Sequence, residues 1–205
     1  MHETESMMYR AEAEAHCDAA KISTLDDILL DRPQADAYCR WLELSEACDG
    51  MPQRRQFRPE QNRLSLSASM LVGVSEHLGK QKLTQRVEGR KVALAFGEGR
   101  KADLYDLYKD SFLSEMLPRW LEVALTGAVA MTESVLQDQN HSDFRFTRLI
   151  LPLFEEDKSV SRLYTVFGFD PQSLAHLDGS LGVQAPRRRN PAAETTMFRD
   201  KRLFG

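Results

Sequence analysis

The chain has 205 residues, a formal net charge of −4 and a sequence pI near 5.8, with 42% hydrophobic and 28% charged residues. This length suits one domain with flanking segments, and this hydrophobic content is enough for a buried core. The acidic balance argues against nucleic-acid binding over the whole surface, and no apolar run approaches the roughly 20 residues of a membrane span. The first 20 residues also lack the basic start and apolar centre of a signal peptide, so we expect a cytoplasmic protein without membrane contact.

The two ends of the chain carry opposite charges. Residues 1–33 hold eight acids and three bases, whereas residues 184–205 hold six bases and two acids. We predict an acidic flexible segment at 1–33, a folded domain at 34–171 and a basic flexible segment at 172–205. This basic end could contact nucleic acid, acidic lipid, an acidic partner or the acidic N-terminal segment of the same or a neighbouring chain, and we favour a solvated end over these alternatives. Its most basic part is Arg187, Arg188 and Arg189.

The first predicted element is an amphipathic helix over Gln34–Asp49. Its apolar side chains recur at helical spacing, and a glycine and a proline stop it. Such a stripe must be buried, so we expect the helix to pack either on the domain or on a second copy of it. Tyr38, Trp41 and Leu42 are therefore candidate residues of a homodimer interface.

The middle of the chain predicts strands followed by helices. Period-two alternation over Leu64–Ser75 indicates a strand. Lys82–Glu88 and Arg90–Phe96 are predicted as two further short strands, or as a strand and a turn. Ala102–Tyr108 and Ser111–Thr126 have helical spacing, and a proline should kink or restart the second helix before a glycine stops it.

Three strands joined by short polar turns complete the domain. They are predicted over Ala128–Gln137, Phe144–Phe154 and Ser159–Phe169, and such short turns join neighbouring antiparallel strands into a meander. Phe144–Phe154 is apolar on both faces, which is typical of a covered central strand. The whole order predicts an α+β fold, an antiparallel sheet of about five strands with helices packed on one face, preceded by the amphipathic helix.

Several short motifs along these elements resemble the PAS superfamily. They are the opening helix with Trp41 and Leu42, followed by Met51–Pro59, Arg86–Gly89, Arg145–Leu153 and Tyr164–Gly168, in that order. The chain looks most like a subgroup of single-domain PAS-like proteins of alphaproteobacteria, over Gln34–Pro171. The resemblance implies a PAS-like fold and a stand-alone sensory or regulatory module whose signal leaves through a partner protein.

PAS-like folds often hold haem, flavin or a small metabolite. The asparagine-cysteine-arginine motif of the flavin photosensors is missing from this sequence, and no histidine falls clearly on a predicted pocket-lining helix, so we predict no cofactor. An apolar pocket for a small molecule is an alternative to plain core packing. Its candidate lining residues are Phe112, Trp120, Phe144, Phe146, Arg148 and Tyr164.

Two arginines stand in predicted strands among apolar neighbours. A buried arginine needs a carboxylate or several carbonyls to compensate its charge. For Arg86 and Arg148 we favour surface exposure or an internal salt bridge, with binding of an anionic ligand as the alternative.

Motifs of catalysis are missing from the sequence. Gly73–His77 begins like a nucleophile elbow but ends in histidine, and no histidine pair has the spacing of zinc ligands. The cysteines, Cys17, Cys39 and Cys48, form no C-x-x-C pair and are predicted to be free thiols. We therefore predict a regulatory protein that is not an enzyme, binds a protein partner and forms a homodimer. The alternatives are a small-molecule sensor and a nucleic-acid-binding adaptor that uses the basic C-terminal segment.

Overall fold

The computed structural model describes residues 31–61, 66–77, 79–99, 101–109, 112–137, 143–170 and 195–197. Residues 1–30 of the predicted acidic segment and most of the predicted basic segment, with its three consecutive arginines, lie outside these residues. All elements described below belong to one compact unit that begins at Arg32. No helix in this described part of the chain is long and apolar enough to cross a membrane.

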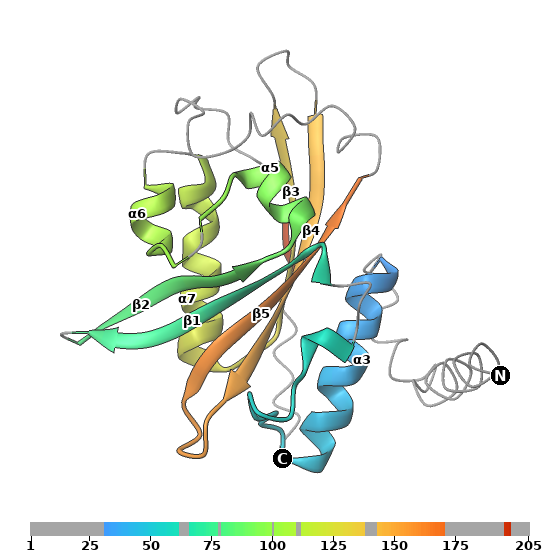
Figure 1. The fold of residues 1–205 in the computed structure, drawn as a ribbon, viewed down its shortest axis with the longest axis vertical. Coiled ribbons are helices and arrows are strands. Elements are labelled where there is room, and N and C mark those ends of the chain that lie inside the picture. Colours follow the sequence, from blue (N-terminus) through green and yellow to red (C-terminus); the bar gives the residue numbers. More distant parts are fainter. Residues whose placement is uncertain are drawn as a thin grey trace, which may run out of the picture. The chain divides into compact units, whose positions relative to one another are not determined.

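The centre of the unit is an antiparallel sheet with the strand order β2-β1-β5-β4-β3-β6 (Figure 1). The predicted meander of β3, β4 and β5 is confirmed, and β4 lies between two neighbours as a central strand. The short β6 comes from the predicted C-terminal segment and pairs with β3. The bounds are β1 Ser69–His77, β2 Lys80–Glu88, β3 Ala130–Gln137, β4 Asp143–Phe154, β5 Val160–Phe169 and β6 Thr195–Met197.

Helices inserted between β2 and β3 cover one face of the sheet, which we call the inner face. They are α5 (Arg90–Phe96), α6 (Leu104–Tyr108), the 3-10 helix η2 (Phe112–Met116) and α7 (Leu117–Thr126). A proline stands in the first turn of α7, where its missing N–H costs no helical hydrogen bond, so the predicted restart is confirmed. Gly127 then ends α7 with a φ of 68°, a left-handed conformation that favours glycine.

Helix α5 corrects one prediction, because Arg90–Phe96 was expected to be a strand or a turn. Val92, Ala95 and Phe96 are all buried, and their spacing of three and four residues places them on one side of a helix. Just before α5, Gly89 lets the backbone pass close to that of Leu66, since a Cβ at Gly89 would lie 2.2 Å from the Leu66 carbonyl oxygen. A short apolar run does not distinguish a buried strand from a short buried helix.

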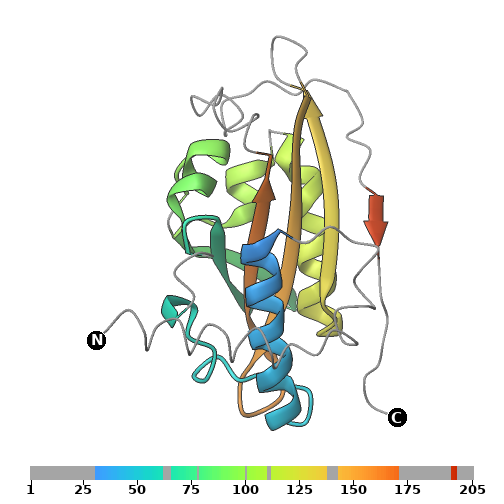
Figure 2. The ribbon, with the colours of Figure 1, turned by 90° about the vertical axis from the view of Figure 1, so that its right-hand side faces the viewer.

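Helix α3 (Arg32–Ala47) packs on the opposite face, which we call the outer face (Figures 1 and 2). The buried side-chain amide of Gln34 donates to Thr147 Oγ1 at 3.0 Å and to the Val166 carbonyl at 3.1 Å. Trp41 Nε1 donates to the Pro152 carbonyl at 2.8 Å. These bonds fix the helix over β4 and β5. The α+β class predicted from sequence is therefore confirmed, with the amphipathic helix ahead of the sheet.

The short segment 101–103 covers the middle of β2, which is an edge strand of the sheet. The Gln85 N–H donates to the Ala102 carbonyl at 2.9 Å, and the Lys101 N–H donates to the Gln85 carbonyl at 2.7 Å. Thr84 forms an isolated antiparallel bridge with Asp103. These bonds use backbone groups of β2 that an edge strand otherwise leaves open. The 3-10 helix η1 (Pro59–Gln61) lies in the connection between α3 and β1.

Candidate functional site

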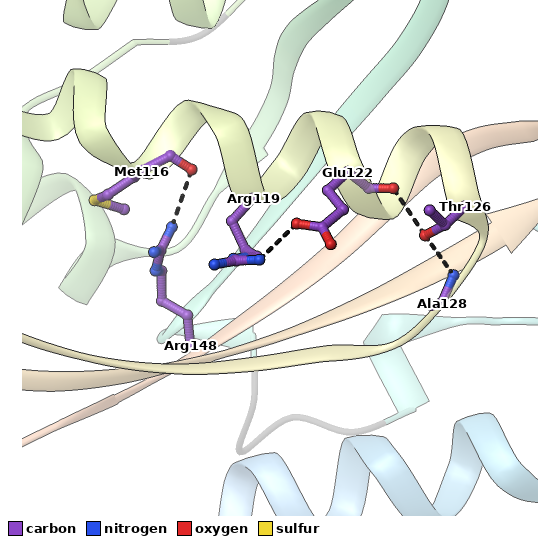
Figure 3. Close-up of polar contacts among 6 residues, drawn as sticks. All are labelled: Met116, Arg119, Glu122, Thr126, Ala128 and Arg148. Atoms are coloured by element: carbon purple, nitrogen blue, oxygen red, sulfur yellow. Dashed lines mark hydrogen bonds and ion pairs between the residues drawn. The ribbon is translucent and has the colours of Figure 1, made fainter. Parts of the chain in front are cut away.

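The inner face holds a wholly buried arginine. Arg148 on β4 has no exposed surface, and its guanidinium carbon lies 5.3 Å from the centre of the Trp120 ring. Its NH1 donates to the Met116 carbonyl at 3.4 Å, and Figure 3 shows the side chain reaching from the sheet to the start of α7. An aromatic face attracts a cation most strongly where water is excluded. Trp120 is itself fixed, because its Nε1 donates to Thr165 Oγ1 at 2.9 Å.

A second buried polar group lies at the end of β2. Glu88 accepts a hydrogen bond from the side chain of Gln85 and two long ones from the Gly99 N–H, at 3.2 and 3.3 Å. The hydroxyl of Tyr108 lies 3.5 Å from Gln85 Oε1, at the limit of a hydrogen bond. A Cβ at Gly99 would lie 2.4 Å from Leu107 Cδ2, so a larger residue there would displace the Leu107 side chain.

The charges inside the fold influence one another through the core. Burial raises the pKa of Tyr108 well above its usual range, and the Glu88 carboxylate raises it further. The Arg148 guanidinium acts in the opposite direction and lowers that pKa. Tyr108 is therefore a neutral hydrogen-bonding group between a buried anion and a buried cation. Such an arrangement can hold a polar ligand or stabilise the fold, but it lacks a nucleophile activated by a base.

Aromatic rings fill the inner face beneath α5. Phe96 lies 5.3 Å from both Phe146 and Phe167, measured between ring centres, and Phe144 lies 5.6 Å from Phe146. Edge-to-face and offset rings at these separations are favourable packing. The predicted pocket residues Phe144 and Phe146 therefore belong to a packed aromatic cluster. Phe96 was missed by the sequence reasoning because its segment was assigned to a strand or turn.

The structure brings some predicted pocket residues together and separates others. Trp120 and Arg148 are in contact, next to the aromatic cluster. Tyr164 lies on the outer face, where its ring centre is 5.0 Å from that of Phe57. It therefore does not share a site with the other residues. The side chain of Phe112 lies outside the described residues.

The predicted interface residues all belong to α3. Trp41 is buried and bonded within its own chain, and Tyr38 stacks beside it with ring centres 6.4 Å apart. Tyr38 and Leu42 are both half-buried. Of the cysteines in this part of the chain, Cys48 is a free thiol, whereas Cys39 is disulfide-bonded. The prediction of a free thiol is therefore wrong for Cys39.

Arg86 and Arg162 lie together on the outer face, and Arg54 is close enough to influence the charge of Arg162; we call these three residues the arginine patch. Arg86 occupies an irregularity in the pairing of β1 with β2. A Cβ added at Gly73 of β1 would lie 2.7 Å from Arg86 Nε and 3.5 Å from Arg162 NH1, so both side chains lie over this glycine. Arg162 NH1 donates to the Ser161 carbonyl at 2.6 Å.

An open cleft lies near the turn between β4 and β5. Its volume is about 320 Å³, and the exposed ion pair of Arg55 with Glu156, at 2.8 Å, forms part of its wall. None of the charged side chains that line this cleft is buried. Within the described residues, no group of three or more histidine, cysteine, aspartate or glutamate side chains could hold a metal ion.

No protein-family model and no curated protein matches the chain. Among solved structures, the chain is similar to the PAS domain of a protein from Colwellia psychrerythraea, with a TM-score of 0.38 and 7% identity, over 55% of this chain and 97% of that one. It is also similar to an RNA-binding light-oxygen-voltage receptor, with a TM-score of 0.37 and 11% identity, over 82% of this chain and 64% of that one. The fold itself consists of five long antiparallel strands, with α5 to α7 between the second and third strands and packed on one face.

Proposed function

We propose that this chain is a PAS-like regulatory module that works through protein–protein contacts rather than catalysis. The observation that carries the proposal is an uncovered strip on the outer face of the sheet. Helix α3 covers β4 and β5, whereas Arg86 and Val87 on β2 remain exposed. The order of motifs over Gln34–Pro171 supports placing the chain with the single-domain PAS-like proteins of alphaproteobacteria.

The composition of this strip is that of a binding surface. Val87 is 56% exposed, and its β1 partner Leu71 is half-buried beside it. The arginine patch borders these apolar side chains. Arginine is enriched in protein–protein interfaces, whose buried centres are more apolar than the rest of the surface, whereas lysine and glutamate are depleted there. The strip therefore fits a protein partner better than a small solute.

Site-specific photo-crosslinking tests the proposal. A photoreactive amino acid replaces Val87 in the full chain, and the matched control places it at Leu125, which is 69% exposed on α7. In cells of the native host, we expect a discrete crosslinked protein at position 87 and none at position 125. Equal crosslinking at both positions, or none at 87, would contradict the use of the outer face.

A second copy of the chain is the other partner that we propose. The apolar centre of α3 is already used inside the chain, since Trp41 bonds to Pro152. A homodimer through α3 would therefore use its half-buried flank, at Tyr38 and Leu42. Sedimentation equilibrium should show a dimer that Leu42→Glu dissociates. A monomer at all concentrations of the wild-type chain would refute the homodimer.

A small-molecule sensor is the second candidate function, and the buried polar groups of the inner face favour it. Arg148, Glu88 and Tyr108 place a cation, an anion and a neutral hydroxyl inside one helix-covered core. Native mass spectrometry of the purified chain should then show bound mass, and the ligand should raise the melting temperature. A bare polypeptide isolated directly from the native host would argue against this function.

A further inference from the structure

The arginines of the arginine patch form no ion pair within 4.0 Å with a carboxylate in the described part of the chain. By contrast, Arg40, Arg55 and Arg119 each have such a partner. Arg162 has only the Ser161 carbonyl as a hydrogen-bond acceptor among those residues. Most donors of the three guanidinium groups are therefore available to a molecule that binds from outside.

The charges of Arg54 and Arg86 are close enough to repel that of Arg162. Partial burial lowers the pKa of Arg162, and the like charges of Arg54 and Arg86 lower it further, while Glu155 acts in the opposite direction. Arg86 and Arg162 are held together over one residue, Gly73, which has no side chain to separate them. An anion bound between them would relieve this repulsion and accept charge-assisted hydrogen bonds.

We infer that the arginine patch binds an acidic segment of a partner protein, through side-chain carboxylates of that segment. The inference rests on the proposed function and names the chemistry of its partner. A planar guanidinium binds a carboxylate with two parallel hydrogen bonds, which suits two arginines held side by side. Val87 next to the patch offers an apolar contact to the same segment.

A protein segment fits this surface better than a nucleic acid does. Nucleic-acid backbones are bound by broad basic stripes that neutralise many phosphates. Here the patch is small, the chain has a net charge of −4, and the acidic turn Glu155–Asp157 follows directly after β4. This turn would repel a polyanion that extended beyond the patch, whereas a short acidic segment with an apolar residue could avoid it.

Selection from a random peptide library tests the inference and requires no candidate partner. Random twelve-residue peptides are selected on the full-length wild-type chain and, in parallel, on Arg86→Gln/Arg162→Gln and on the control Arg90→Gln, an exposed arginine of α5. We expect aspartate and glutamate to be enriched on the wild type and the control but not on the double variant. Enrichment without acids, enrichment that the double variant retains, or no enrichment at all would overturn the inference.

Binding constants of the selected peptide then separate charge from geometry. Fluorescence anisotropy should show that the double variant binds the peptide at least about tenfold more weakly than the wild type does. Gly73→Ala should also weaken binding although the net charge is unchanged, because the new Cβ would displace Arg86. A glutamine version of the peptide should not bind. Tighter binding of a uridine octamer than of the peptide would overturn the choice of a protein partner.

The two proposals can fail separately. Crosslinking at position 87 together with a failed peptide selection would leave the protein-binding function standing and remove the acidic partner. Loss of both results would remove the proposed function itself. Circular dichroism of each variant confirms that it is folded before its binding is compared.

Discussion

Arg148 and Arg86 have similar sequence contexts but opposite physical environments. Both stand in strands among apolar residues, yet Arg148 points to the inner face and is wholly buried, whereas Arg86 lies on the outer face in contact with water. The buried guanidinium is compensated within the fold by Trp120 and by the Met116 carbonyl. The exposed one has no ion-pair partner among the described residues. An arginine thus stabilises the interior on the inner face, whereas an arginine on the outer face remains available for binding.

The largest expected effect is the difference in the free energy of unfolding between variants of these two arginines. Arg148→Ala should lower the free energy of unfolding by about 4 kcal/mol, because it removes the cation next to Trp120 and leaves a cavity and uncompensated groups. Arg86→Ala should change it by less than about 0.5 kcal/mol, as is usual at an exposed position. Urea denaturation of both variants measures the difference. Similar values for the two would show that Arg148 is not held as described.

The next effect tests how firmly α3 covers the outer face. Trp41→Ala should cost about 3 kcal/mol, because it removes a buried aromatic side chain from the contact with β4. Trp41→Phe keeps most of the packing and loses the hydrogen bond to Pro152, which should cost about 1 kcal/mol. Thermal and urea unfolding of both variants give these values. A Trp41→Ala variant as stable as the wild type would mean that α3 does not depend on this contact.

A smaller effect is expected from the amide at the other end of α3. Gln34→Ala should cost about 2 kcal/mol, because it leaves the Val166 carbonyl and the Thr147 hydroxyl without their buried partner. Amide hydrogen exchange should quicken in the first turns of α3 in this variant. Gln34→Glu, of equal size, should recover neither stability nor protection, because a carboxylate cannot donate to the Val166 carbonyl.

The smallest effect is a pH dependence that arises on the inner face. The folded pKa of Tyr108 is raised above its unfolded value of about 10, so its stabilising contribution is full below about pH 10 and is lost as the pH rises further toward the folded pKa. The free energy of unfolding should therefore fall by about 1 kcal/mol per pH unit above pH 10 on account of this residue. Urea titrations at several alkaline pH values should show this slope in the wild type and a shallower one in Tyr108→Phe. Tyr105→Phe controls for loss of an exposed tyrosine hydroxyl from the same helix.

Periodicity was sufficient to predict most elements, but not the face to which each side chain points. Phe146 and Tyr164 both lie in strands whose two faces are buried, so hydrophobicity alone gave no reason to place them on opposite sides of the sheet. The irregularity in the pairing of β1 with β2 puts Arg86 and its neighbour Val87 on the same face, which strict alternation along a strand does not predict. Glu88 and Tyr108 were missed as a pair because they come together only when α6 packs on the end of β2.

The covered middle of β2 limits how this molecule can meet others. Lys101, Ala102 and Asp103 already occupy the backbone positions where an incoming strand would begin to pair. Copies of the chain are therefore discouraged from joining edge to edge into a continuous ribbon at this side of the sheet. Recognition here must depend on side chains, which differ between partners, rather than on the backbone, which is common to every protein. A closed edge thus favours selectivity as well as resistance to aggregation.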